Sequence, residues 1–302
     1  MTRTIASRTR TELRRQARTP QRAAAWLTRT LCAALLTASL GGCAPEPDDA
    51  GREGSLVEPV ARIESSEGPL WLGAPPASSP VDDDVLAAAA RGVAAVRARG
   101  CGPVSNGTVF AVAPGVLVGA AHVIAGASAI EIEWSPSGAV DPSTYPAVVV
   151  GYEEGRDLAL LLIDAAVPPL GIDQARVGAS GVVLGYPEGG GLVASPARIE
   201  HYVSATGLWG DGTARSVYVV AADIRTGQSG APLVDQGGNV VGVAFGTVRG
   251  PSQIGFALSR AELVGFLVSA GVDARVDTLG RTVIGARPGD LSEVPNGECG
   301  GG

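Results

Sequence analysis

The sequence contains little histidine: among its 302 residues only His122 and His201 are histidines, and both precede Ser229. A serine nucleophile needs a general base, which is usually an imidazole. The α/β-hydrolases place this histidine after the serine, so the sequence excludes their chain order. Cysteine and histidine also never occur at metal-ligand spacing, so we expect no metal and no other cofactor.

Positive charge and long hydrophobic runs are scarce as well. The net charge is −7, which argues against a nucleic-acid partner. The apolar run 31–40 is shorter than the roughly 20 residues that span a bilayer as a helix. It follows an arginine-rich segment in which Glu12 is the only acid, the pattern of a secretory signal. The sequence therefore predicts export to the cell envelope or periplasm.

The end of this signal resembles a bacterial lipobox, Leu40-Gly41-Gly42-Cys43, which implies that Cys43 is lipidated and anchors the protein to the membrane. A simple signal peptide, or a transmembrane anchor lengthened by residues 23–27, are the alternatives. If Cys32 leaves with the signal and Cys43 is acylated, Cys101 and Cys299 remain of the four cysteines. In an oxidising compartment we expect these two to form a disulfide, with two free thiols as the alternative.

The rest of the chain divides by composition. Residues 1–43 form the signal with the lipobox, residues 44–84 are rich in proline and acids and predict a disordered tether, and residues 85–302 form the folded domain. In that domain short apolar runs alternate with turn signals, which predicts an all-β fold. Helices are expected at 85–91 and 261–270, and loop from there to the end. The strands are expected at 93–98, 108–113, 116–119, 129–134, 146–152, 158–163, 181–185, 197–206, 215–222, 232–236, 239–247 and 254–258.

The segment Arg225-Thr226-Gly227-Gln228-Ser229-Gly230-Ala231-Pro232-Leu233-Val234 places a serine between glycines ahead of an apolar strand. The N–H groups of Gly227 and Ser229 can together form an oxyanion hole. His122 follows an apolar strand and two alanines, which leave room for the ring to face a cleft. Asp157 begins a buried strand, where its carboxylate would be held rigidly. The three residues suit a triad of nucleophile, base and orienting acid.

These segments resemble the chymotrypsin-like (trypsin-fold) serine proteases in order and in sequence: Ala-Ala-His, Asp-Leu-Ala-Leu-Leu and Gly-x-Ser-Gly-x-Pro-Leu. The resemblance implies two six-stranded antiparallel β-barrels with a short C-terminal helix, serine endopeptidase activity on proteins or peptides, and catalysis by His122, Asp157 and Ser229.

One branch matches further. Residues 183–191, 194–198, 222–224 and 255–258 are similar to the periplasmic acid-resistance serine proteases of mycobacteria and their actinobacterial relatives, over about residues 93–299. This likeness implies the same pairing of Cys101 with Cys299, and a role in envelope protein processing or stress response. Three features depart from the family: the membrane-spanning helices are missing, Gln228 replaces Asp or Asn, and Ala231 replaces the commoner Gly.

Several other residues are weighed against the triad. His201 lies in an alternating strand and is expected to be structural, and Asp141, Asp164 and Asp211 lack the rigid setting of Asp157. Asp223 suits either the acid of the primary specificity pocket or a salt bridge with Arg225 or Arg198. The predicted pocket walls are residues 223–228, 244–247 and 254–257. The pocket residues singled out within them are Asp223, Thr226, Gln228, Ala244, Phe245 and Gly246.

Two other functions remain open on the sequence alone. The departures at Gln228 and Ala231 suit a catalytically inactive protease fold that serves as a binding module. The second alternative is a lipid-anchored scaffold of the cell wall.

Overall fold

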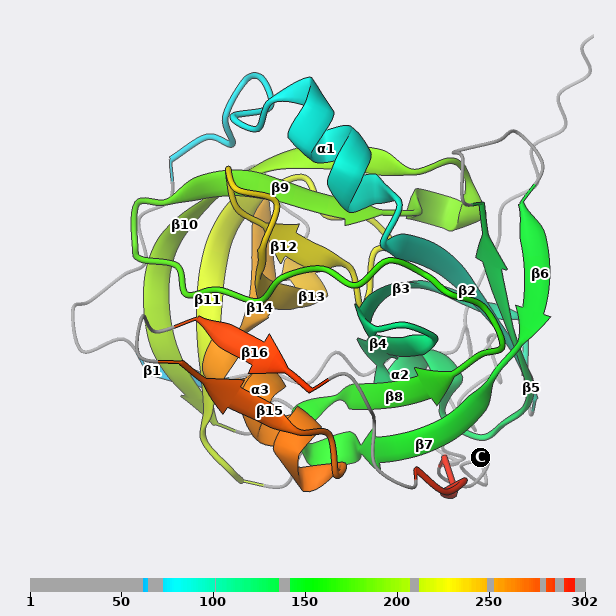
Figure 1. The fold of residues 1–302 in the computed structure, drawn as a ribbon. Helices are drawn as coiled ribbons and strands as arrows, with labels where there is room; N and C mark the ends of the chain where they lie inside the picture. Colours follow the sequence, from blue (N-terminus) through cyan, green and yellow to red (C-terminus); the bar gives the residue numbers. More distant parts are fainter. Residues whose placement is uncertain are drawn as a thin grey trace, which may run out of the picture. The chain divides into compact units, whose positions relative to one another are not determined.

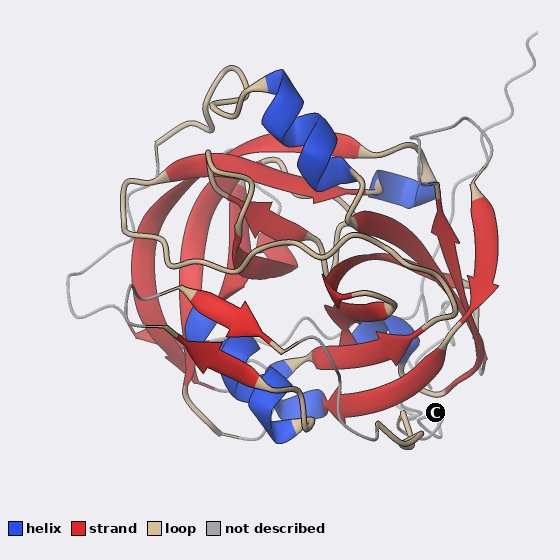
Figure 2. Ribbon diagram, in the orientation of Figure 1, coloured by secondary structure: helices blue, strands red, loops and turns tan. Residues whose placement is uncertain are grey.

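The structure is a computed structural model that describes residues 62–64, 73–100, 102–135, 142–206, 212–248, 253–277, 281–285 and 291–296. The predicted signal, Cys43, Cys101 and Cys299 lie outside these residues, as do Asp141 and Asp211. Strands dominate the described part (Figure 2). None of its helices is long and apolar enough to cross a membrane.

The first antiparallel sheet includes β4 (Val116–Ala120) and β8 (Leu158–Leu162), whose ends adjoin His122 and Asp157. Its strands, in spatial order, are β6 (Ser143–Pro146), β5 (Ala127–Trp134), β2 (Val93–Gly100), β3 (Ser105–Ala113), β4, β8 and β7 (Val148–Glu153). The sheet curls, but no pairing among the described strands joins β6 to β7. It is therefore an open half-barrel of seven strands, where the resemblance implied a barrel of six.

The second antiparallel sheet carries Ser229. Its strands, in spatial order, are β1 (Arg62–Glu64), β10 (Val193–Thr206), β11 (Arg215–Ala222), β14 (Ile254–Ser259), β13 (Val240–Val248), β12 (Pro232–Val234) and β9 (Ser180–Gly185). The first half of β10 also pairs with β9, which closes six strands into a barrel. The predicted all-β fold is thus confirmed, with strands close to the expected ranges (Figure 1).

Parts of the chain differ in detail from the expectation, and β6 has no counterpart among the expected strands. β1 lies within the range predicted as a tether, where its backbone pairs with residues 204–206 of β10. The stretch after the last helix was expected to be loop, and this was wrong, because β15 (Ala274–Val276) and β16 (Thr282–Ile284) form a hairpin there. Strands of three residues are too short to show an alternating pattern in the sequence. The N–H of Thr282 also donates to a distant partner, the carbonyl of Ile172.

Helices are few and short. α1 (Asp83–Ala90) begins with two acids in its first turn, where they suit the positive end of the helix dipole. α3 (Arg260–Ser269) follows β14 and buries Leu263, Phe266 and Leu267. One continuous core joins α3 to both sheets, with Phe110, Leu160 and Leu258 among its fully buried members. The smaller elements are α2 (Ala121–Ile124), η1 (Glu154–Arg156) and η2 (Pro187–Gly189).

Candidate active site

Ser229 lies in the loop between β11 and β12, and this loop packs against the first sheet. The backbone N–H of Thr108, on β3, donates to the carbonyl of Ser229 at 2.9 Å. Gly230 has φ +85°, and a Cβ there would lie 2.3 Å from the Thr108 carbonyl oxygen and 2.7 Å from the Ala120 nitrogen. Only glycine allows this approach, which brings the half-buried serine next to the strand that leads to His122.

His122 is the second residue of α2, directly after the buried strand β4. Its neighbours Ala121, Val123 and Ile124 are buried, while 48% of the His122 side chain is exposed. The helix is therefore fixed by its apolar side chains, and the imidazole is the part that reaches solvent.

Asp157 joins η1 to β8 and holds α2 by three contacts. Its carbonyl accepts from the Ala121 N–H at 3.1 Å, its Oδ1 accepts from the His122 N–H at 2.8 Å, and its Oδ2 lies 2.7 Å from His122 Nδ1. A carboxylate only accepts hydrogen bonds, so Nδ1 carries the proton and Nε2 is left as the basic nitrogen. The acid thus fixes both the position and the tautomer of the ring.

The backbone at Asp157 is left-handed, with φ 55° and ψ 40°, and the residue is only 2% exposed. Aspartate tolerates this conformation better than most residues, although it is uncommon outside glycine. The neighbouring Arg156 is braced by two acids: Nε donates to Glu262 of α3 at 3.0 Å, and Nη1 pairs with Glu153. The two ion pairs of Arg156 thus fix the chain next to Asp157, and a non-glycine residue held in a left-handed conformation is often found at functional sites.

Two opposing effects act on the pKa of His122. The protein that surrounds the half-exposed ring desolvates it in part and lowers its pKa, while the hydrogen bond to Asp157 and the negative charge of that carboxylate raise it. The net result is a pKa above the ordinary value of 6.5. Asp157 therefore stabilises the imidazolium that forms when the ring accepts a proton.

The N–H groups of Gly227 and Ser229 have no protein acceptor within the part of the chain that the structure describes. Gly227 has φ +91°, and a Cβ there would lie 2.4 Å from the carbonyl oxygen of Tyr186. Its own carbonyl accepts from the Thr108 hydroxyl at 2.8 Å. Two unpaired amides two residues apart in the serine loop are available to bind the oxygen of a tetrahedral intermediate.

Thr108 is the residue at this site that sequence reasoning missed. It is fully buried, and its hydroxyl both donates to Gly227 and accepts from the Tyr186 N–H at 3.0 Å. It therefore ties β3, the chain after β9 and the serine loop together. The signal for it was a hydroxyl residue at the start of the apolar run 108–113, and only the fold shows which segments it joins.

No hydrogen bond between His122 Nε2 and Ser229 Oγ occurs among the described residues. In enzymes without substrate this contact is often long and shortens only in the substrate complex. The structure thus shows the paired histidine and aspartate formed, with the serine loop beside them. Within the described residues, no group of three or more His, Cys, Asp or Glu could hold a metal ion.

A cavity of about 310 Å³ lies beside the serine loop. Its walls are Glu188, Ala222, Asp223, Ile224, Arg225, Thr226, Thr247, Val248 and Gln253. Asp223 and Thr226 line it, as do Ile224, Arg225 and Thr247 of the predicted walls. Asp223 pairs with Arg225 at 2.8 Å, one of the two salt bridges that the sequence suggested. Glu188, with φ 56°, adds a second acid that the sequence did not suggest.

Four of the six pocket residues singled out from the sequence do not line this cavity. Ala244 is fully buried in the core of the second sheet. The side chain of Gln228 is also fully buried, accepting from the Arg225 N–H at 2.9 Å and donating to Ser195 Oγ at 3.3 Å. Phe245 and Gly246 lie further along β13, with Phe245 stacked on Phe256. His201 lies in β10 opposite Val219, at an irregularity of the register.

Comparison with known proteins shows the family of the chain. The family described as trypsin-like peptidase domain matches residues 107–243. Serine protease Rv3671c of Mycobacterium tuberculosis H37Rv is 34% identical over 233 residues, which are 74% of this chain and 56% of that protein. Bovine mitochondrial serine protease HTRA2 is 34% identical over 177 residues, 55% of this chain and 36% of that one.

A crystal structure of a serine protease matches this chain over nearly the whole length of the crystallised protein. The crystal structure of the Rv3671c protease from M. tuberculosis in its active form superposes with a TM-score of 0.63 and 31% identity. The match covers 78% of this chain and 97% of that one. The crystallised protein is a part of Rv3671c, and the matched region spans only 56% of the full Rv3671c sequence. From its fold, its site and these matches, the chain belongs to the trypsin-like serine protease family.

Proposed function

We propose that this protein is a serine endopeptidase that cleaves protein or peptide substrates by means of Ser229, His122 and Asp157. The observation that carries the proposal is the contact of both carboxylate oxygens of Asp157 with His122, beside the loop of Ser229. Family membership supports the same chemistry.

In this mechanism His122 Nε2 takes the proton of the Ser229 hydroxyl as Oγ attacks the peptide carbonyl carbon. The Gly227 and Ser229 amides bind the resulting oxyanion. The imidazolium then gives its proton to the leaving amine, and the acyl-enzyme forms. Water repeats the sequence, with His122 again as the base, and releases the acid product.

The direct test is incubation of the purified protein with an unfolded protein, followed by mass spectrometry of newly formed peptide termini. We expect new termini with the wild-type protein and none with Ser229→Ala. Cleavage by both proteins would assign the activity to another group or to a contaminant.

The departures at Gln228 and Ala231 do not favour an inactive binding module. A Cβ on Gly185 would lie 3.0 Å from both the Gln228 Cγ and the Ala231 Cβ, so glycine at 185 leaves the space that these side chains fill. Both residues are buried, away from the exposed face of the serine loop. They therefore act as packing residues, and the nucleophile keeps its setting.

We propose the cellular setting from the sequence. Residues 1–43 would direct export, and Cys43 would carry the lipid. Residues 44–84 would tether the catalytic domain of residues 85–302 to the membrane. The substrates would be envelope proteins. The mass of the N-terminal peptide of the exported protein tests this proposal. An unmodified Cys43 in that peptide would contradict lipidation.

The pKa of His122 predicts how the activity depends on pH. The base must be neutral, and the folded protein raises its pKa above 6.5, so the active fraction falls as pH drops through that raised value. We expect kcat/KM on a short peptide to fall about tenfold per pH unit below it. The profile is to be measured from pH 4.5 to 9, with circular dichroism to confirm folding, and full kcat/KM at pH 4.5 would exclude His122 as the base.

The proposed disulfide gives a prediction of stability. Gly100, the residue before Cys101, pairs with Ala127. The N–H of the adjacent Gly126 donates to the carbonyl of Asn296 at 3.0 Å, and Asn296 lies three residues before Cys299. These contacts bring the chain before Cys101 close to the chain before Cys299. The bond would close a loop of nearly two hundred residues, worth up to about 5 kcal/mol in the entropy model.

We therefore expect reduction, or Cys299→Ser, to lower Tm by up to about 10–20 °C. Peptidase activity at 25 °C should fall far less than on loss of Ser229, because no triad residue is removed. Scanning calorimetry with and without reductant measures the change, and Cys299→Ser is its own control, because the Tm of that variant should not respond to reductant. An unchanged Tm would leave the two thiols free.

A further inference from the structure

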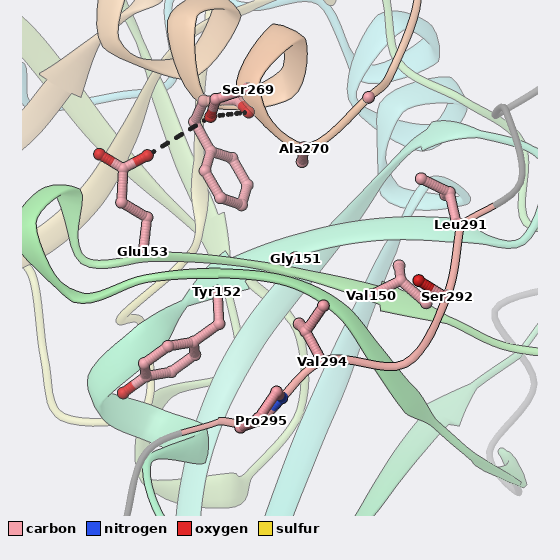
Figure 3. A pocket seen from close by; sticks show the side chains of 12 residues that line it. Val150, Gly151, Tyr152, Glu153, Ser269, Ala270, Leu291, Ser292, Val294 and Pro295 are labelled. Carbon is pink, nitrogen blue, oxygen red and sulfur yellow. Dashed lines mark hydrogen bonds between the residues drawn. The ribbon is translucent and has the colours of Figure 1, made fainter.

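A second cavity, of about 690 Å³, lies between β7, the end of α3 and residues 291–295 (Figure 3). Much of its lining is apolar, from Val150, Phe266, Ala270, Leu291 and Val294. None of its lining residues belongs to the cavity beside Ser229. Its volume falls in the range of sites that hold small ligands or short peptide segments.

One charged side chain, that of Glu153, lines this cavity. Its Oε1 pairs with Arg156, whereas among the described residues its Oε2 accepts only a long 3.5 Å hydrogen bond from the Ser269 hydroxyl (Figure 3). Oε2 therefore keeps capacity for another donor. The cavity also lies at the C-terminal end of α3, where the helix dipole is negative and the last turn has no basic residue. Both features favour a positively charged ligand.

Two of the segments that line the cavity connect to the paired side chains of His122 and Asp157. On one side Tyr152 and Glu153 continue through η1 to Asp157. Burial, and then the charges of Glu154 and Asp157, raise the pKa of Tyr152 above its ordinary value, so this side chain is a neutral part of the wall.

On the other side, residues 291–295 precede Asn296, which clamps the turn after α2. Its Nδ2 donates to the carbonyls of Ile124 at 2.8 Å and Ala127 at 2.9 Å. The cavity thus lies between the segment that ends at Asp157 and the segment that holds the turn behind His122.

We propose that this cavity is a second binding site, which takes the basic side chain of an apolar-flanked segment of a protein substrate, away from the bond that is cut. The guanidinium or ammonium group lies against Glu153 Oε2, and the flanking apolar side chains contact Phe266, Leu291 and Val294. The substrate role rests on the proposed peptidase function, while the binding itself does not.

The test uses the full chain with Ser229→Ala, so that binding is measured without cleavage. Isothermal titration compares acetyl-Leu-Arg-Val-amide with the same peptide carrying citrulline, which keeps the shape of arginine and lacks its charge. We expect the arginine peptide to bind at least about tenfold more tightly, since hydrogen bonds between charged partners are the stronger ones.

Three variants locate the site. Glu153→Gln should lose the preference for arginine. Glu262→Gln is its matched control, because it removes the other acid on Arg156 but does not line the cavity, and it should keep the preference. Asp223→Asn, in the cavity beside Ser229, should also keep it.

Ala270→Leu gives an independent check if Glu153→Gln fails to fold, since the larger side chain fills the cavity and should weaken both peptides. Three results would overturn the proposal: no binding, equal binding of the two peptides, or a preference that is lost in Asp223→Asn and kept in Glu153→Gln. A wild-type protein without peptidase activity would instead overturn the proposed function and leave the binding result standing.

Discussion

Replacement of Ser229 by alanine is expected to lower kcat on a peptide substrate by on the order of 10⁶-fold, as the loss of the nucleophile does in other enzymes of this type. Removal of the ring by His122→Ala should cost about as much, because the nucleophile and the base act as one unit. The double variant should then be no slower than either single one.

Each of these variants has a matched control in the same chain. Ser128→Ala removes an exposed hydroxyl that bonds only the Arg99 carbonyl among the described residues, and His201→Ala removes the other histidine. Both should keep kcat within a few fold. Activity of the Ser229→Ala protein near the wild-type level would refute the assignment of the nucleophile.

The second large effect is expected for Asp157→Asn, which should lower kcat by about 10⁴-fold, the magnitude known for this class of triad. Both oxygens of Asp157 accept from His122, one from the backbone N–H and one from Nδ1–H. An amide has one acceptor atom, so its NH₂ group must face one of these two donors. If it faces Nδ1, the ring proton moves to Nε2 and the base is lost.

Asparagine also adopts the left-handed conformation readily, so the backbone at residue 157 should be preserved and the loss is chemical. The control is Asp164→Asn, an exposed acid beyond the other end of the same strand. Steady-state kinetics of both variants decide the point. A near-normal kcat for Asp157→Asn would give the orienting role to another acid.

The sequence predicted most of the strands because each apolar run is bounded by turn residues and buries one face or both. It also predicted the segments of the site, since His122, Asp157 and the Ser229 loop each lie at the end of a recognisable apolar strand. What it could not predict depends on distant partners. Thr108 acts through contacts with Gly227 and Tyr186, about 120 and 80 residues away.

The predicted pocket illustrates the same limit. Gln228 and Ala244 lie close in sequence to cavity residues, yet the chain directs both side chains into the core. Glu188 enters the cavity because η2 packs against the serine loop, where its N–H donates to the Thr226 carbonyl at 2.7 Å. Which side chains of these segments face the cavity therefore depends on the fold and not on their position along the chain alone.

The most direct test of the central claim, that Ser229 is an activated nucleophile, is labelling with a fluorophosphonate followed by mass mapping of the modified residue. Only a serine with a working base reacts readily. The structure predicts one adduct, on Ser229, which is absent in His122→Ala and in the heat-denatured protein. An unlabelled protein, or an adduct on any other serine, would contradict it.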